Sequence, residues 1–302
     1  MPALFRLLVI VSCTLATSQV ANAAPTAIEY FHNGYGHYFV TATPQEIAAL
    51  DAGTLPGWAR TGESFEVLAV GSYGASNVCR FWSGQTFAPK SSHFYTSNAT
   101  ECAERRGDPS WIYEGERFAL MLPDGAGACS GGAIPLYRLY NDGIGNAPNH
   151  RYTTNLSIRA RMLTQGWDAE GVGRGVVGCV LPSLAPELVK GHVIDGTIEG
   201  ALVCHDANRN GRCDAGEAQA YTDAGGAYAL TIPKDLPVPL VAEVIAGRAR
   251  DSDEPQSTID VSFRMSTPSR AYSTDITPFS TLVQLTGRDD YLLAEDQVRG
   301  LL

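Results

Sequence analysis

Short apolar and aromatic runs, separated by glycine turns, recur three times in the first half of the chain. Each set begins with an aromatic-rich stretch that ends in a turn with Asn or Ser and Gly, and a His-aromatic stretch follows. Runs of this kind predict two β-strands. A polar start then opens a short helix, because Ser, Thr and Asn side chains cap helix N-termini. A tryptophan leads into a final strand, so each set predicts strand, strand, helix and strand.

The three sets are copies about 50 residues apart, a spacing within the range of repeat architectures. In the order first strand, second strand, helix and tryptophan, the copies cover residues 30–34, 37–41, 47–50 and Trp58; residues 79–84, 93–96, 102–106 and Trp111; and residues 137–143, 150–153, 158–163 and Trp167. A single unit is too small to bury a core. We therefore expect the three units to pack around one pseudo-threefold centre.

The pattern changes after residue 181, where prolines and small residues at 182–188 predict a linker. Strand-like runs with glycine turns follow, and their spacing predicts a β-sandwich over residues 189–270. The C-terminal segment, residues 271–302, is expected to be partly helical because residues 292–302 have helical apolar spacing. The chain stops inside that pattern, so either the helix ends there or the architecture is a shortened one.

The expected fold is thus mainly β with short helices. A pseudo-threefold repeat domain of strand–strand–helix–strand units covers residues 24–181, and the β-sandwich domain follows it. The first 23 residues are set apart as a signal peptide: Arg6, a short apolar run and Ala21-Asn22-Ala23 are the parts that a signal peptidase reads. A lipoprotein site at Cys13 is the alternative, and it would ignore this cleavage site. We expect a secreted or cell-surface protein, with the periplasm as the other possibility.

Charge and hydropathy exclude two classes of partner. The formal net charge is −10, whereas binding to nucleic acid or an anionic membrane surface needs a basic patch. No segment after the signal peptide is apolar enough to span a membrane, which takes about 20 apolar residues. The sequence does not determine the oligomeric state.

Cysteine usage agrees with export. Six of the 7 cysteines lie beyond Cys13, and an even number in an exported chain favours disulfides over buried free thiols. Cys204 and Cys213 bracket a polar loop and are predicted to pair. The other four cysteines allow three connectivities, of which we predict Cys79–Cys102 within the second copy and Cys129–Cys179 across the third.

Several ring residues of the repeats are candidate ligand contacts. His37, His93 and His150 recur and could converge on a metal, although a hydrogen bond that orients each strand is the favoured role. The repeated tryptophans are expected to be core residues because of the large area they bury. Tyr35, Trp82 and Tyr140, beside polar turns, are better platforms for a ligand.

The recurring Y-R-F-Y-N, H-F-Y-T and W-x-x-E-G-x-x-F elements resemble a bacterial family of secreted repeat domains whose function is not assigned. The resemblance covers about residues 27–181. The first copy departs from it with Thr61-Gly62 in place of Glu-Gly, and the third lacks the final aromatic. The family offers no mechanism to transfer.

Residues 206–217 match the calcium-loop pattern D-x-[DN]-x-[DN]-G-x5-E at every position. Calcium takes six to eight oxygen ligands, and closely spaced short oxygen side chains can wrap around it. The expected ligands are the side chains of Asp206, Asn208, Asn210, Asp214 and Glu217 and the backbone carbonyl of Arg212. The alternative is a polar turn without metal.

The flanks of this loop are β-rich rather than EF-hand helices. With the glycines and the T-D-x-G-G-x-Y-x-L stretch after it, residues 189–247 resemble the calcium-binding, prealbumin-like B-type repeats of bacterial surface proteins. That resemblance implies a stalk or spacer stiffened by calcium. Residues 273–283 resemble the segment that follows such repeats in long exported proteins.

No nucleophile elbow, zinc-protease motif or phosphate loop occurs in the sequence. The favoured function is therefore an exported, non-enzymatic binding or surface-display protein, whose partner is a glycan or cell-wall polymer. Two alternatives stay open. One is a cell-wall hydrolase, or its accessory domain, that uses His and Glu residues of the repeats; the other is a purely structural spacer.

Overall fold

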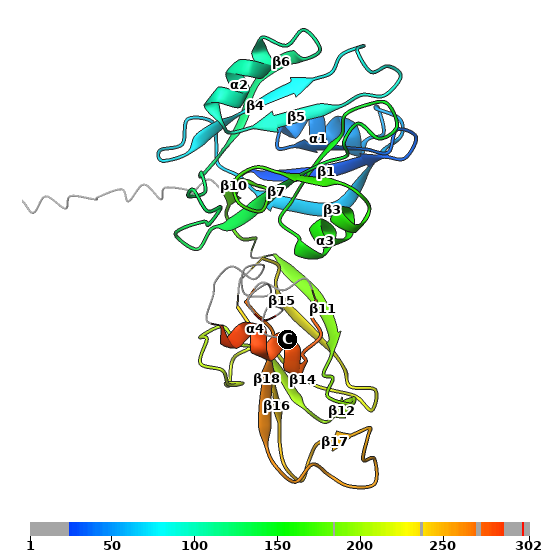
Figure 1. Cartoon of the computed structure of the whole chain (residues 1–302), viewed down its shortest axis with the longest axis vertical. Coiled ribbons are helices and arrows are strands. Elements are labelled where there is room, and N and C mark those ends of the chain that lie inside the picture. The colour runs from blue at the N-terminus through cyan, green and yellow to red at the C-terminus, as the bar shows by residue number, and fades with distance from the viewer. Residues whose placement is uncertain (1–23, 184, 236–237, 270–272, 287–297, 299–302) are drawn as a thin grey trace, which may run out of the picture.

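The computed structural model describes residues 24–302, except for residues 184, 236–237, 270–272, 287–297 and 299–302 (Figure 1). The predicted signal peptide at 1–23 lies outside the described residues, as does nearly all of the helix predicted at 292–302. The described part is mainly β, with short helices, as the sequence predicts.

The three repeat units fold as predicted, each as strand, strand, helix and strand. Unit 1 contains β1 (Thr26–His32), β2 (His37–Thr41), α1 (Pro44–Asp51) and β3 (Trp58–Glu66). Unit 2 contains β4 (Ser76–Trp82), β5 (His93–Thr96), α2 (Ala99–Arg106) and β6 (Ile112–Leu120). Unit 3 contains β7 (Ile134–Tyr140), β8 (His150–Thr153), α3 (Leu156–Thr164) and a last strand in two pieces, β9 (Asp168–Glu170) and β10 (Val176–Val180).

Each unit forms its own antiparallel sheet with the first strand in the middle. The orders are β2-β1-β3, β5-β4-β6 and β8-β7-β10, and β9 also pairs with β7. Between the units, short bridges connect the ends of the last strands in a cycle: Leu68 with Ala119, Met121 with Cys179, and Glu66 with Leu181. Every unit is therefore bonded to both of its neighbours, and the three form a closed ring.

The core of the ring is shared by all three units. One buried cluster contains Tyr30 and Phe39 from unit 1, Tyr95 from unit 2, and Leu136 and Tyr152 from unit 3. The phenol groups are satisfied inside it: the Tyr152 hydroxyl donates to the Tyr95 carbonyl at 2.9 Å, and the Tyr95 hydroxyl donates to the Val40 carbonyl. A core made in this way explains why one unit would not be stable alone.

The C-terminal strands form two main sheets over one core. Their bounds are β11 (Pro186–His192), β12 (Ile198–Glu199), β13 (Leu202–His205), β14 (Gln219–Tyr221), β15 (Ala227–Pro233), β16 (Leu240–Val244), β17 (Arg250–Asp251) and β18 (Phe263–Ser266). One sheet pairs β11 with β15, the other has the order β14-β13-β16-β18, and β12 pairs with β17 apart from both. Tyr228 and Leu230 of the first sheet share a buried cluster with Val203, Ala242 and Met265 of the second.

The segment after β18 completes this core. Ile276 is fully buried within it and forms a parallel bridge with Val193. Helix α4 (Pro278–Leu285) follows, with Thr277 and Ser280 in a capping box. Val283 of α4 shares an apolar cluster with Tyr137 and Leu156 of unit 3, so this helix contributes to both halves of the chain.

The three repeat helices differ in how their N-termini are capped. Asn98 and Asn155 accept backbone N–H bonds at the starts of α2 and α3, whereas Thr43 makes no side-chain cap bond at the start of α1. Loss of a cap typically costs about 1 kcal/mol. We therefore expect Asn98→Ala and Asn155→Ala each to lower the free energy of unfolding by about that amount, and Thr43→Ala to lower it less. Urea unfolding measures all three, and equal losses would contradict the assignment.

Candidate functional site

The charged residues of the repeats gather where one unit meets the next. Arg80 of β4 is 3% exposed, and it donates two hydrogen bonds to Glu46 of α1, at 2.8 and 2.7 Å. The same guanidinium lies 2.7 Å from Glu114 of β6, and Glu114 in turn lies 3.4 Å from His93. The arginine of unit 2 is thus held between a glutamate of unit 1 and one of its own unit.

Unit 3 repeats this arrangement against unit 2. Arg138 donates to both oxygens of Glu101, at 2.9 and 2.8 Å, and lies 3.0 Å from Glu170. Glu170 lies 3.3 Å from His150. Buried charges are tolerated when they are paired and hydrogen-bonded. The bonds to Glu46 and Glu101 meet that condition, whereas the contacts with Glu114 and Glu170 are ion pairs without hydrogen-bond geometry.

At the third junction the signs of the charges are exchanged. The pairing register aligns Glu29 of β1 with Arg80 and Arg138, and Thr61 stands where the other units have Glu114 and Glu170. Glu29 is fully buried and accepts two bonds from Arg151 of unit 3, at 2.9 and 2.8 Å. Thr61 donates to the same carboxylate at 2.7 Å.

These contacts lower the pKa values of the acidic partners at the first two junctions, whereas at Glu29 burial outweighs the bonds from Arg151 and raises the pKa of the carboxyl group. Burial alone would raise the pKa of Glu46, but the bonds from Arg80 and Thr41 outweigh it and hold that pKa at about 2. Burial is likewise outweighed at Glu114 and Glu170, where the neighbouring histidine and arginine lower the pKa of the carboxyl group. Burial lowers the pKa of His93 and His150, which favours neutral rings.

The three histidines do not form one site. His93 and His150 lie five residues before their helix caps, but Tyr38 holds that position in unit 1 and His37 comes one residue earlier. His37 is buried, and its Nδ1 bonds with the carbonyl of Ser91 at 2.7 Å. Among the residues that the structure describes, no three His, Cys, Asp or Glu side chains are arranged to hold a metal.

The aromatic candidates have different surroundings. Tyr35 stacks on His32, with ring centroids 3.7 Å apart, and Trp82 donates its indole N–H to Ser91 at 2.8 Å. Tyr140 stacks on His150 and lines a cleft of about 400 Å³ between units 2 and 3. The repeated tryptophans pack as core residues: Trp111 is 9% exposed, and Trp58 and Trp167 pack against buried clusters.

The predicted calcium loop connects β13 and β14. Asp206, at its first position, is buried and accepts backbone N–H bonds from Asn210 and Gly211 at 3.0 and 2.8 Å. Glu217, at the last position, reaches back to the backbone N–H groups of Ala207 and Asp214, at 2.9 and 3.0 Å. The loop is closed on itself by the carboxylates at its two ends.

The middle of the loop is equally rich in oxygen. Asn208 and Asn210 both donate to one oxygen of Asp214, at 2.8 and 2.6 Å, and these bonds lower the pKa of that carboxyl group. Gly211 has φ +72°, a conformation that glycine adopts without strain. Carboxylate and amide oxygens are the ligands that calcium favours. In this structure the loop's three carboxylates are not grouped as a metal site, and the amide nitrogens of Asn208 and Asn210 face Asp214.

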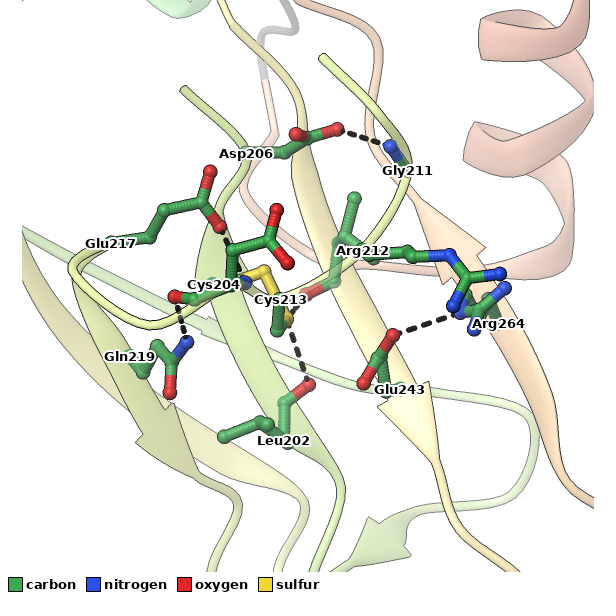
Figure 2. Close-up of a disulfide and its surroundings, with 12 residues drawn as sticks. Leu202, Cys204, Asp206, Gly211, Arg212, Cys213, Glu217, Gln219, Glu243 and Arg264 are labelled. Atoms are coloured by element: carbon green, nitrogen blue, oxygen red, sulfur yellow. Dashed lines mark hydrogen bonds and ion pairs between the residues drawn. A yellow bond between two sulfur atoms is a disulfide. The ribbon is translucent and has the colours of Figure 1, made fainter. Parts of the chain in front are cut away.

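All three predicted disulfides are present. Cys204–Cys213 joins β13 to the loop, with the Cα atoms 5.4 Å apart, and Figure 2 shows this bridge with Asp206 and Glu217 beside it. Cys79–Cys102 joins β4 to α2, and Cys129–Cys179 joins β10 to the segment before β7. The prediction of this connectivity is confirmed.

Sequence reasoning missed most of the junction charges. It singled out the histidines and glutamates of the repeat, but not Arg80, Arg138 or their partners Glu46 and Glu101. A signal was available, because Glu46 and Glu101 both stand three residues after a helix cap. The Glu29–Arg151 pair breaks the repeat pattern, and only the fold brings these residues together across 122 positions.

The first half of the chain is therefore a closed, disulfide-bonded repeat domain with ion pairs at its junctions. A protein-family model described as a Domain of unknown function (DUF5648) matches residues 26–177, which is half of the chain and runs from unit 1 to the start of β10 in unit 3. The chain belongs to this family. No curated protein and no solved structure gives a significant match.

Removal of the junction arginine provides a stability test. Arg80→Ala leaves Glu46 and Glu114 without their buried partner, and loss of one member of a buried pair typically costs about 3–5 kcal/mol. Arg60 is the matched control, because it also makes a two-bonded pair, with Asp51, but its side chain is 48% exposed. We expect Arg60→Ala to cause only a small fraction of the loss. Similar losses in chemical unfolding would contradict the structural role of Arg80.

The low pKa of Glu46 predicts a pH dependence. Its carboxylate stabilises the folded state fully above the unfolded pKa of 4.5, and this contribution is lost as the pH falls towards about 2. Glu46→Gln should therefore be less stable than the wild type at pH 7, by at most about 3 kcal/mol. The difference should shrink between pH 4.5 and about 2. A constant difference across that range, measured by urea unfolding, would refute the assignment.

Proposed function

We propose that this is an exported, non-catalytic binding protein, in which the repeat domain holds a ligand and a calcium-stabilised sandwich supports it. The observation that carries the proposal is the loop at residues 206–217. It combines an oxygen-rich turn with the Cys204–Cys213 bridge, which ties the turn to β13. Both features suit the environment outside the cytoplasm, where disulfides persist and weak calcium sites can fill.

Export is supported by independent features. Residues 1–23 have the pattern of a signal peptide. Two disulfides lie within the repeat domain and one within the sandwich, which is typical of proteins of oxidising compartments. Within the described ranges, no helix is long and apolar enough to cross a membrane.

The proposed calcium ligands are the side chains of Asp206, Asn208, Asn210, Asp214 and Glu217 and the carbonyl of Arg212. Bound calcium would supply a cross-link between the start and the end of this loop. Since the loop connects β13 to β14, the ion would stiffen the edge of the larger sheet. The resemblance to prealbumin-like B-type repeats of surface proteins supports a display role for this half.

The histidine–glutamate pairs favour binding over hydrolysis. A hydrolase acting on glycans needs an acid with a raised pKa. Glu114 and Glu170 instead have lowered pKa values, because each is held between a histidine and an arginine. Both carboxyl groups therefore stay ionised and are poor proton donors. The proposed partner is accordingly a glycan or cell-wall polymer that is bound and not cleaved.

A sedimentation assay tests the binding function. The mature protein, from Ala24 onwards, should co-sediment with insoluble peptidoglycan or polysaccharide in millimolar calcium, and the polymer should release no soluble sugar. Retention of the protein in the supernatant with every polymer would contradict the binding role. Release of soluble fragments would favour the hydrolase instead.

A calcium titration tests the loop. A site that binds only the folded state should raise the melting temperature, with a stabilisation of about 1.4 kcal/mol when calcium is ten times its Kd. Glu217→Gln should weaken this response, because it removes a ligand charge. Glu254→Gln removes the same charge from an exposed turn of the sandwich and should respond like the wild type. A melting temperature that does not change with calcium would contradict the site.

A further inference from the structure

We propose that the cleft between units 2 and 3 binds a neutral carbohydrate, a mono- or short oligosaccharide, at one site per chain. This inference rests on the proposed binding function and assigns its site and ligand class. The cleft lies between the C-terminal end of α2 and the loop that connects β7 to β8, and its volume is about 400 Å³. That size is within the range of small-molecule pockets, about 300–1,000 Å³.

Aromatic rings form part of the lining. Phe87 and Trp111 pack together with ring centroids 6.2 Å apart. Trp111 is 9% exposed and has Arg105 over its ring at 6.0 Å, so the partly exposed rings are those of Phe87 and Tyr140. Tyr140 is half-buried, and His150 covers one side of its ring at 4.8 Å and 17°. A ligand that fits such a lining needs an apolar face, which the C–H groups of a sugar ring provide.

Charged groups supply the polar part of the lining. Arg105 pairs with Asp108 at 3.1 Å, and both side chains are partly exposed. Glu170 also faces the cleft and is fixed by Arg138 and His150. Carboxylates accept bonds from hydroxyl groups and a guanidinium donates to them, so this set can bind several hydroxyls at once.

The charge balance selects against anionic ligands. Two carboxylates and one arginine line the cleft, and the whole chain has a net charge of −10. The backbone N–H and the side chain of Ser110 both hydrogen-bond to Asp108 and lower the pKa of its carboxyl group, which keeps it ionised. A phosphate or uronate would meet repulsion here, whereas a neutral polyol would not.

The cleft is formed before a ligand arrives. Asn141 locks the β7–β8 loop, because its side chain donates to the carbonyls of Ile144 and Ala147 and accepts from Gly143 and Asn149. Lys90 of unit 2 donates to the Gly145 carbonyl of the same loop at 2.7 Å. A site that is already ordered loses less free energy when it binds.

The other two junctions lack the cationic group. Arg105 lies seven residues after the helix cap of unit 2, and the same position holds Leu50 in unit 1 and Met162 in unit 3. Leu50 and Met162 are both buried. The repeat therefore provides the complete polar set at one junction, which sets the expected stoichiometry at one ligand per chain.

The test is a titration of the mature protein with trisaccharides, in which binding is measured by isothermal titration calorimetry. Cellotriose, maltotriose, mannotriose and tri-N-acetylchitotriose are the neutral probes, and trigalacturonic acid is the anionic one. We expect one neutral probe to bind at one per chain and the anionic probe not to bind. Arg105→Ala and Tyr140→Ala should each weaken binding at least tenfold. Arg106→Ala, on the same helix but outside the cleft, should leave it unchanged.

Three outcomes would overturn the proposal: no neutral probe binds at 10 mM of probe, on the order of the weakest useful affinities; binding is unaffected by Arg105→Ala; or the anionic probe binds instead. Arg105 is partly exposed, so this variant should fold even if Tyr140→Ala does not, and it then decides alone. If the wild type and Arg105→Ala sediment equally with a polymer, the binding function stands and the assignment to this cleft fails.

Discussion

The buried ion pairs between the units are the constraint on which the repeat domain depends. Each unit offers a small sheet and a short helix, too little to bury a core, and each must find two neighbours in a fixed order. Arg80 and Arg138 make equivalent bonds to the helix of the preceding unit, while Glu29 makes the opposite-signed bond to Arg151. A unit placed in the wrong position would bring like charges together or leave a charged side chain buried without a partner. We infer that the exchanged signs specify how the ring closes.

Differences between the three units distinguish positions that hold the ring together from positions that are available for ligand binding. The shared tyrosines and the bridges between strand ends keep the ring closed. Positions that vary, such as Leu50, Arg105 and Met162, give each junction its own surface. Only the junction of units 2 and 3 combines aromatic rings with Arg105 and Asp108, and there the domain has its proposed ligand site. In the sandwich, Cys204–Cys213 and the oxygen-rich loop concentrate the covalent and the proposed ionic cross-links in one turn.

Much of this architecture could be predicted from local sequence, because local signals determined it. The glycine turns, the capping residues Asn98 and Asn155 and the tryptophans indicated the order of elements in every unit, and cysteine position led to the correct disulfides. The junctions could not be predicted in this way, since Glu29 and Arg151 approach only after the ring closes. The histidine alignment shows the other limit. One extra residue separates His37 from its helix, so Tyr38 occupies the position that His93 and His150 hold in the other units. A shift by one residue along a strand moves a side chain to the opposite face of the sheet.

A double-mutant cycle on Glu29 and Arg151 tests the central claim most directly. Glu29→Gln, Arg151→Met and the double variant would be compared with the wild type by urea unfolding at pH 7. If the pair holds the third junction, the double variant should lose less free energy of unfolding than the two single variants lose in sum. The difference, the coupling free energy, should be at least about 1.5 kcal/mol. Losses that add to within about 0.5 kcal/mol would contradict the account, because the ring would then close without this pair.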